Sequence, residues 1–242
     1  MLVSEEIANR LVEEAGISRE DVVLEIGAGS GIITKRLAKK AKEVVSYEVD
    51  RDLYEHTKRV FSSIENLVLK LGDAFDPSNE DPFDVCVTSL PYSESLRFVK
   101  WLAIRSGSFK RCIAVVQEEF AEKISSDEGS DSYRAVSVIA QNSFVIERLF
   151  TIDRDEFRPI PKVVSEVVRL TPSNVFKQPF FDSQRISFVN RLFSFRGKLV
   201  SAAIKKILEP EVRKRVPREL LGMRIEDLVP TEIGELMVEL ER

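Results

Sequence analysis

The stretch VVLEIGAGSGIITKRL, residues 22–37, contains the features that decide the fold. It begins with a short aliphatic run, passes through Gly27, Gly29 and Gly31, and continues into a segment with helical spacing. Glycines at such a turn let the backbone fold tightly and let a ligand lie against it without meeting a Cβ atom. The stretch therefore predicts a buried strand, a ligand-binding turn and a helix in succession.

Four further aliphatic runs share the character of the first one. Several of them are apolar on both faces, and segments with helical spacing separate them. Strands that are buried on both faces and alternate with helices specify a parallel sheet covered on each side. The four runs are residues 43–50, 67–73, 83–90 and 111–117.

The pattern changes after Gln117. Residues 118–124 have helical spacing, and the runs at 135–141, 143–152 and 162–172 follow with little room for crossover helices. We expect these three runs to be antiparallel strands that close one edge of the sheet.

Both ends of the chain are predicted to be helical. Ser4 is a suitable N-cap for an amphipathic helix that ends at Gly16, and the pattern is helical from about Phe180 onward. We therefore expect an α/β fold with a mostly parallel seven-stranded sheet, an antiparallel edge and a small C-terminal all-helical domain. The predicted domains are residues 1–174 and 175–242.

The composition excludes several classes of protein. With 43% hydrophobic and 31% charged residues, the chain is typical of a folded protein. Its two cysteines, Cys86 and Cys112, lie in aliphatic runs and provide no disulfide framework. A single histidine, His56, excludes a histidine metal cluster and disfavours a Ser-His-Asp hydrolase. No apolar run approaches the roughly 20 residues that span a bilayer, so we expect a cytoplasmic protein without a metal or membrane partner.

The spacing of the glycines narrows the choice of cofactor. A dinucleotide fingerprint would need glycine at position 32, where Ile32 stands. The observed acid-x-GxGxG pattern from Glu25 to Gly31 resembles the first motif of Rossmann-like S-adenosyl-L-methionine-dependent methyltransferases. A glycine turn that serves only the strand-to-helix geometry is the alternative interpretation.

Two carboxylates follow at the ends of later strands. Glu48 lies 19 residues past Gly29, where its carboxylate can accept both ribose hydroxyl protons. Asp50 competes for this role. Asp73, followed by Ala74, ends the third strand and can accept from the exocyclic amine of an adenine; its alternative role is to cap the next turn.

The segment Ser89-Leu90-Pro91-Tyr92 lies at the carboxyl end of the fourth predicted strand, where open α/β sheets bind ligands. An exocyclic amine on a nucleobase is a poor nucleophile because its lone pair is delocalised into the ring. The Ser89 side chain and the carbonyl of Leu90 or Pro91 can accept from its N–H groups, and Tyr92 can stack on the base.

Six segments together resemble the ribosomal RNA adenine dimethyltransferase family, in order and in spacing, over essentially the whole chain. They are VLEIGAGSGIIT (23–34), YEVDRDL (47–53), GDA (72–74), LPY (90–92), VQEEFAEKI (116–124) and FRPIPKVVSEVVRL (157–170). The resemblance implies transfer of two methyl groups from S-adenosyl-L-methionine to N6 of each of two neighbouring adenosines. The target is a terminal hairpin loop of small-subunit ribosomal RNA, and the partner is the immature small subunit.

The resemblance also implies roles for individual residues. Ser89 occupies the catalytic amide position, with Leu90 and Pro91 beside it, and Tyr92 and Phe157 sandwich a flipped adenine. A core aromatic is the alternative interpretation of Phe157. The residues implied to contact the cofactor are Leu2, Glu25, Gly27, Gly29, Glu48, Asp73, Ala74 and Ser89.

The chain departs from the family pattern at three places. Ser89 stands where the family usually has Asn, and a hydroxyl has a shorter reach than an amide and can donate as well as accept. The family's Gln-x-Phe-Leu segment, which helps to cover cofactor and target, is matched by Leu2 alone. Val164 stands where the family often has Asp. A catalytically weak relative that acts as an RNA-binding assembly factor is therefore kept as the alternative function, whereas the glycine spacing disfavours a nicotinamide enzyme.

The charge is distributed unevenly. The net charge is −4, yet residues 175–225 carry 12 basic and 4 acidic side chains. We expect this segment to face RNA, with an ordinary solvated helix surface as the alternative. We also expect a monomer. Ten of these basic residues are expected to line the RNA-facing side: Arg185, Arg191, Arg196, Lys198, Lys205, Lys206, Arg213, Lys214, Arg215 and Arg218.

Overall fold

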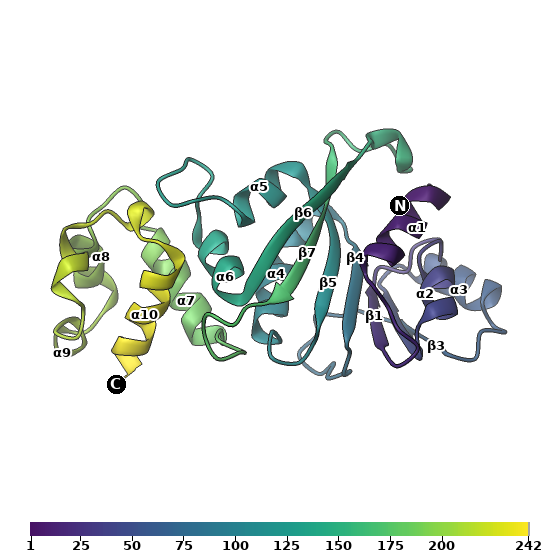
Figure 1. The fold of residues 1–242 in the computed structure, drawn as a ribbon, viewed down its shortest axis with the longest axis horizontal. Helices are drawn as coiled ribbons and strands as arrows, with labels where there is room; N and C mark the ends of the chain where they lie inside the picture. Colours follow the sequence, from purple (N-terminus) through teal and green to yellow (C-terminus); the bar gives the residue numbers. More distant parts are fainter. Residues whose placement is uncertain (242) are drawn as a thin grey trace. The chain divides into compact units, whose positions relative to one another are not determined.

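The aliphatic run before the glycines forms β1 (Val22–Ile26), a strand inside a seven-stranded sheet (Figure 1). A computed structural model describes residues 1–241 of the chain. The strand order in the sheet is β3-β2-β1-β4-β5-β7-β6. The remaining strands are β2 (Glu43–Glu48), β3 (Leu67–Leu71), β4 (Val85–Ser89), β5 (Arg111–Gln117), β6 (Phe144–Ile152) and β7 (Ser165–Pro172).

The first five strands are parallel, as the alternation of strands and helices predicts. β7 pairs antiparallel with β5, which makes the sheet mixed at this edge. Ile26 is aligned with both Tyr47 on β2 and Thr88 on β4. The residues that follow these strands therefore meet at one edge, which is where ligands of open α/β sheets bind.

Helices from the N-terminal part cover one face of the sheet. The Ser4 hydroxyl caps α1 (Glu5–Glu14) by accepting the N–H of Ile7, as predicted. Leu11 of this helix and Leu37 of α2 (Thr34–Lys40) are fully buried in one cluster with apolar residues of β1, β2, β4, β5 and β7. The next helices are α3 (Arg51–Val60), α4 (Ser95–Ile104) and α5 (Glu118–Ile124), with a short 3-10 turn, η1 (Tyr92–Glu94), before α4.

The prediction of a strand at residues 135–141 is wrong. This run belongs to the helix α6 (Ala135–Ser143), in which residues 136–140, 142 and 143 are all buried. A helix buried on every side has no polar face, so its sequence shows no amphipathic period and is indistinguishable from a buried strand. The two other runs of this part form β6 and β7 as expected.

The described chain separates into two compact units. The first consists of residues 1–98, 108–121 and 145–172 and contains nearly the whole sheet. The second consists of residues 99–107, 122–144 and 173–241 and is mainly helical.

The later helices belong to the second unit. They are α7 (Ser183–Phe193), α8 (Val200–Ile207), α9 (Pro210–Arg213) and α10 (Pro230–Glu241), with 3-10 turns at Arg218–Gly222 and Ile225–Asp227. Within this unit α6 packs against α7 and α10, and the buried Tyr133 donates a hydrogen bond of 2.9 Å to the carbonyl of Leu228. The second unit thus includes segments that the sequence analysis assigned to the first domain.

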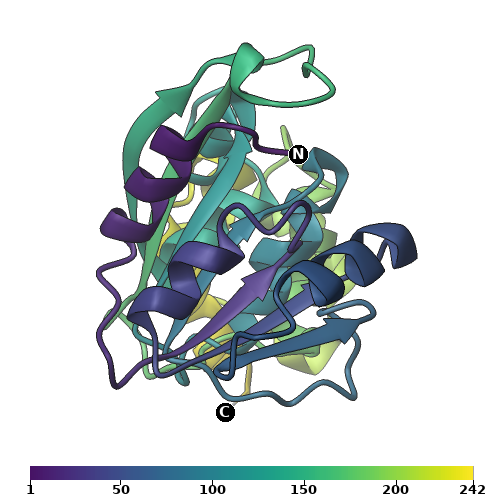
Figure 2. The ribbon, with the colours of Figure 1, turned by 90° about the vertical axis from the view of Figure 1, so that its right-hand side faces the viewer.

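The observed architecture confirms the predicted fold class, an α/β protein with a mostly parallel sheet, an antiparallel edge and a helical C-terminal part. Figure 2 shows the sheet of the first unit with its strands rotated relative to one another, the right-handed twist expected of such sheets. Within residues 1–241, no helix has the length and apolar character needed to span a bilayer.

Candidate active site

A cavity of about 700 Å³ opens in the first unit, at the carboxyl ends of β1, β2 and β4. The loops that follow these strands form its wall, together with the segment between β6 and β7 and the first residues of the chain. All but one of the residues predicted to form the site line this cavity. They are Leu2, Gly27, Gly29, Glu48, Asp73, Ala74, Ser89, Leu90, Pro91, Tyr92 and Phe157.

The glycine turn after β1 needs glycine for two different reasons. Gly27 has a φ of 87° and faces the Ser89 carbonyl across the cavity floor. Gly31 has a φ of 79°, and a Cβ atom there would lie 2.0 Å from Cε2 of Phe61. The turn also approaches α3, because the Thr57 hydroxyl donates a 3.0 Å hydrogen bond to the carbonyl of Gly29. Backbone conformation and close packing together hold the turn against the ends of β2 and α3.

Glu48 is the carboxylate that contacts this turn. It is 6% exposed, and its Oε2 accepts the N–H of Gly29 at 2.7 Å while Oε1 accepts the N–H of Asp50 at 3.0 Å. Asp50 instead caps α3 by accepting the N–H groups of Asp52 and Leu53. Since Glu48 lines the cavity and Asp50 does not, the geometry favours Glu48 over its competitor.

Glu25 is the predicted site residue that the structure places elsewhere. It is 1% exposed, does not line the cavity, and accepts hydrogen bonds from the hydroxyls of Ser46 (2.5 Å) and Thr34 (2.7 Å). Burial raises its pKa to about 7, against the effect of the two hydroxyls, and the nearby charge of Glu48 raises it further. Glu25 therefore links β1 to Thr34 at the start of α2 and to Ser46 on β2. The expectation that it contacts the cofactor directly does not fit this position.

The Ser89-Leu90-Pro91-Tyr92 segment is shaped by the end of β4 and the 3-10 turn that follows it. Pro91, with a φ of −54°, begins this turn, and its carbonyl accepts the N–H of Glu94 at 2.9 Å. This bond leaves the Leu90 carbonyl as the better second acceptor for a ligand. The Tyr92 hydroxyl lies 2.5 Å from the hydroxyl of Ser165, a buried residue at the start of β7, so the tyrosine ring is held at the cavity wall.

The first residues of the chain pair with the segment between β6 and β7, and Figures 1 and 2 both show the two side by side. Leu2 and Phe157 form an antiparallel bridge, the N–H of Val3 donates to the carbonyl of Glu156, and the N–H of Arg158 donates to the carbonyl of Met1. Phe157 is 6% exposed and belongs to the apolar core while its ring also lines the cavity. Both interpretations of this phenylalanine are therefore compatible with its position.

Comparison with known proteins decides the family. The chain matches the family described as "Ribosomal RNA adenine dimethylase" over residues 1–240. It belongs to the ribosomal RNA adenine dimethylase family.

Individual relatives agree with this assignment. A "Ribosomal RNA small subunit methyltransferase A" from Thermotoga petrophila is 31% identical over 232 residues, which cover 94% of this chain and 86% of the relative. A dimethyladenosine transferase from Plasmodium falciparum has a similar fold, with a TM-score of 0.83 at 24% identity over 100% of this chain and 97% of that one. The 23S rRNA methyltransferase ErmE has a TM-score of 0.71 at 25% identity over 100% of both chains.

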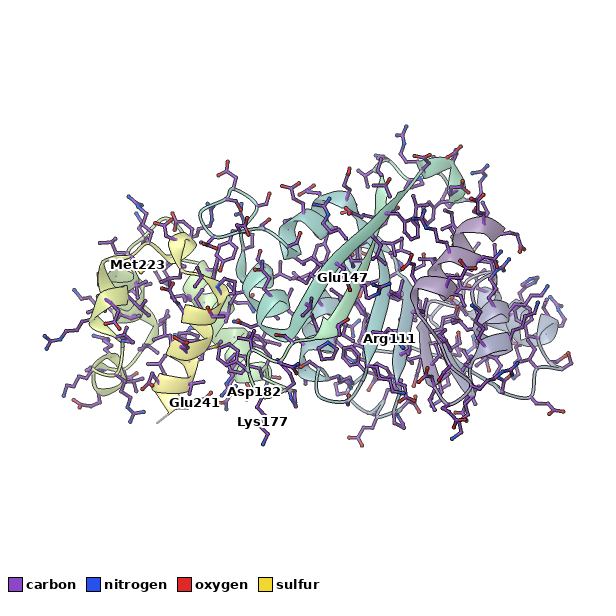
Figure 3. All side chains as sticks on the ribbon, viewed as in Figure 1. Arg111, Glu147, Lys177, Asp182, Met223 and Glu241 are labelled. Atoms are coloured by element: carbon purple, nitrogen blue, oxygen red, sulfur yellow. The ribbon has the colours of Figure 1, made fainter. Side chains whose placement is uncertain are left out.

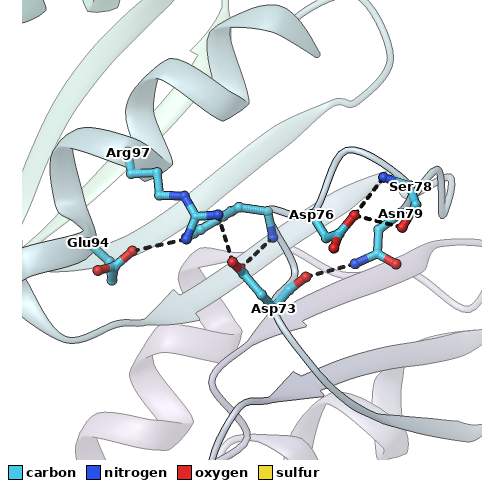
Figure 4. A network of polar contacts seen from close by, with 7 residues as sticks. Asp73, Asp76, Ser78, Asn79, Glu94 and Arg97 are labelled. Carbon is cyan, nitrogen blue, oxygen red and sulfur yellow. Dashed lines mark hydrogen bonds and ion pairs between the residues drawn. The ribbon is translucent and has the colours of Figure 1, made fainter.

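Three residues that contact predicted site residues were missed from the sequence. Ser165 lies in a strand and Thr57 in a helix, and neither belongs to a recognisable motif. Arg97 follows Tyr92 by five residues in the first turn of α4, and its guanidinium contacts Asp73 in the cavity wall (Figure 4). The available signal was a cation in the first turn of a largely apolar helix, shortly after the Ser89–Tyr92 segment.

Most of the basic residues of the C-terminal part contact their own unit. Arg185 forms a two-point ion pair with Glu241, which Figure 3 labels near the end of α10. Other arginines donate to main-chain carbonyls, for example Arg191 to Ile207. Of the ten basic residues predicted to face RNA, four are exposed and form no side-chain hydrogen bond or ion pair within residues 1–241. They are Lys198, Lys205, Lys206 and Arg218.

Gly31→Ala should destabilise the protein without touching the cavity. The added methyl meets the Phe61 ring, and the left-handed backbone disfavours any side chain. We expect the free energy of unfolding to fall by about 2–4 kcal/mol in urea denaturation. Gly222→Ala, at a glycine with open space around its Cβ position, is the control. Equal stability of the two variants would contradict the packing described for the turn.

Glu25→Gln should remove a pH dependence of stability. Because the pKa of Glu25 is raised from 4.5 to about 7, the folded protein retains a proton that the unfolded chain releases. The resulting stabilisation is complete below the unfolded pKa and is lost as the pH rises through about 7. Relative to Glu25→Gln, the natural sequence should lose up to about 3 kcal/mol between about pH 5 and about pH 8. Parallel pH profiles of the two proteins in chemical denaturation would show that the buried carboxyl is not protonated.

Proposed function

We propose that the protein transfers methyl groups from S-adenosyl-L-methionine to N6 of adenosines in small-subunit ribosomal RNA. The observation that carries the proposal is the meeting of the glycine turn with the Ser89–Tyr92 segment in one cavity of a dimethylase-family chain. Following the family, the targets are two neighbouring adenosines of a terminal hairpin in the immature small subunit. Each base receives two methyl groups in this proposal, and the reaction takes place in the cytoplasm. The monomeric state stays a prediction.

The residues around the glycine turn fit the proposed cofactor. Glu48 retains acceptor capacity beyond its two backbone partners, since a carboxylate offers about four lone-pair sites. Asp73 and Ala74 also line the cavity, and Gly27 and Gly29 add no side chains of their own to it. S-adenosyl-L-methionine supplies an electrophilic methyl group when it is bound there. Glu48 would hold the ribose hydroxyls and Asp73 the adenine amine.

The opposite wall is suited to an adenine amine. The Ser89 hydroxyl and the Leu90 carbonyl are acceptors at the end of β4, and accepting from both N–H groups draws the nitrogen lone pair out of the ring system. This leaves the lone pair free to attack along the line to the methyl carbon, so that orientation supplies much of the catalysis. After each attack the positively charged nitrogen loses one proton. No strongly basic side chain is therefore needed to remove a proton before the attack.

Two aromatic rings would hold the target base. The Tyr92 ring is fixed at its hydroxyl by Ser165, and Phe157 lies on the segment that pairs with Leu2. Base stacking on such rings contributes about 1–3 kcal/mol per base and tolerates a base turned out of an RNA loop. The two rings therefore provide the affinity, while Ser89 and Leu90 provide the recognition of an amino group.

The helical part after residue 174 is proposed to contact RNA phosphates. Support comes from four of the predicted RNA-facing residues, which are exposed and form no side-chain hydrogen bond or ion pair within residues 1–241: Lys198, Lys205, Lys206 and Arg218. Such contacts add affinity and salt dependence but carry no choice of base. The arginines that donate to carbonyls of their own unit are proposed to stabilise the helices instead.

Ser89→Ala tests the proposed reaction. We expect transfer of labelled methyl groups to undermethylated small subunits to fall about 100-fold, because one acceptor for the target amine is lost. Binding of S-adenosylhomocysteine, measured by calorimetry, should change less than about twofold. Ser89→Asn, which restores the family's amide, is the control and should retain transfer.

Two results would contradict the proposal. Unchanged transfer by Ser89→Ala would remove Ser89 from the reaction. Cofactor binding by the natural protein without any transfer would favour the alternative, an RNA-binding assembly factor.

A further inference from the structure

Arg97 joins the two walls of the cavity by a contact that the proposed function does not use. Its Nη2 donates to Oδ2 of Asp73 at 2.6 Å, and its guanidinium carbon lies 4.9 Å from the centre of the Phe75 ring (Figure 4). A weaker contact of 3.5 Å joins Nη1 to Glu94. All four residues line the cavity, and the Arg97 side chain is 51% exposed.

Asp73 is held from two directions. Its Oδ1 accepts the N–H of Phe75 at 2.8 Å, and its main-chain carbonyl accepts the Asn79 side-chain amide at 2.7 Å. With Arg97 on Oδ2, each carboxylate oxygen has one partner. About two of the four lone-pair sites of a carboxylate then stay available. Arg97 therefore orients Asp73 without using all of its acceptor capacity.

The remaining acceptor capacity discriminates between bases. An ionised carboxylate accepts hydrogen bonds and donates none, so it matches an exocyclic amine. Replacing that amine with a carbonyl, as in hypoxanthine, would set two acceptors against each other. The Asp73 side chain is 39% exposed, so water still solvates it in part, but a ligand without the amine loses its hydrogen bond to the carboxylate and therefore binds more weakly.

We propose that Arg97 is a positioning residue that fixes Asp73 as an acceptor and thereby makes the cofactor cavity selective for an adenine nucleoside over a hypoxanthine nucleoside. The inference rests on the proposed function, because it assumes that the base of the cofactor lies at Asp73. It adds a residue of α4 to the recognition of the base.

The test is calorimetric binding of two ligands, S-adenosylhomocysteine and its deaminated counterpart S-inosylhomocysteine. Arg97→Met should weaken binding of S-adenosylhomocysteine about tenfold while leaving the weaker binding of the inosyl compound within about twofold. The selectivity ratio should thus fall by nearly the same factor. Arg97→Lys retains the charge but loses the planar donor group. Its affinity for S-adenosylhomocysteine and its selectivity ratio should lie between those of the natural protein and of Arg97→Met.

Arg59→Met is the matched control, because Arg59 is an exposed cation of α3 outside the cavity lining. It should leave both affinities and their ratio unchanged. Thermal unfolding of each variant checks that the fold is intact, which we expect since half of the Arg97 side chain is solvent-exposed.

Three results would overturn the inference alone. Unchanged affinities in Arg97→Met would make the ion pair an ordinary surface pair. An equal loss for both ligands would show a structural role without base selection, and tighter binding of S-adenosylhomocysteine would show that Arg97 competes with the base. If the natural protein failed to bind S-adenosylhomocysteine, the proposed function would fail together with this inference.

Discussion

The hydrogen bond from the Gly29 amide to Glu48 is the interaction on which the site depends. It joins the turn after β1 to the end of β2, and the Thr57 hydroxyl joins the same turn to α3. These two hydrogen bonds hold the turn, with its left-handed glycines, in place at the cavity. The same carboxylate that fixes the turn also lines the cavity, so one side chain both shapes the site and is the group proposed to hold the ribose.

The two walls of the cavity are built on different principles. The wall proposed to hold the cofactor is formed mainly by backbone geometry at the ends of parallel strands, where sheet register brings Gly27 and Glu48 to one edge. The wall proposed to hold the target base depends on contacts between distant segments, such as Tyr92 with Ser165 and Leu2 with Phe157. Substitution of a single residue such as Ser89 can therefore alter the target wall while the cofactor wall stays intact.

The sequence predicted the features that depend on local patterns and missed those that depend on contacts between distant residues. The five parallel strands, the Ser4 cap and eleven of the residues that line the cavity were predictable, because local pattern and strand order determine them. Three features were not predictable in this way. The run at α6 is buried on nearly all sides, Glu25 is directed toward Ser46 and Thr34, and several C-terminal arginines donate to main-chain carbonyls of other segments in their own unit. Each depends on contacts between residues far apart in sequence or on a side-chain direction that composition does not encode.

A crystal structure with bound S-adenosylhomocysteine tests the central claim most directly. The account predicts electron density for the ligand in the cavity, with its ribose hydroxyls on Glu48, its base amine on Asp73 and its sulfur directed toward Ser89. A ligand bound elsewhere, or a cavity that stays empty at saturating ligand with Glu48 bonded only to the amides of Gly29 and Asp50, would contradict it.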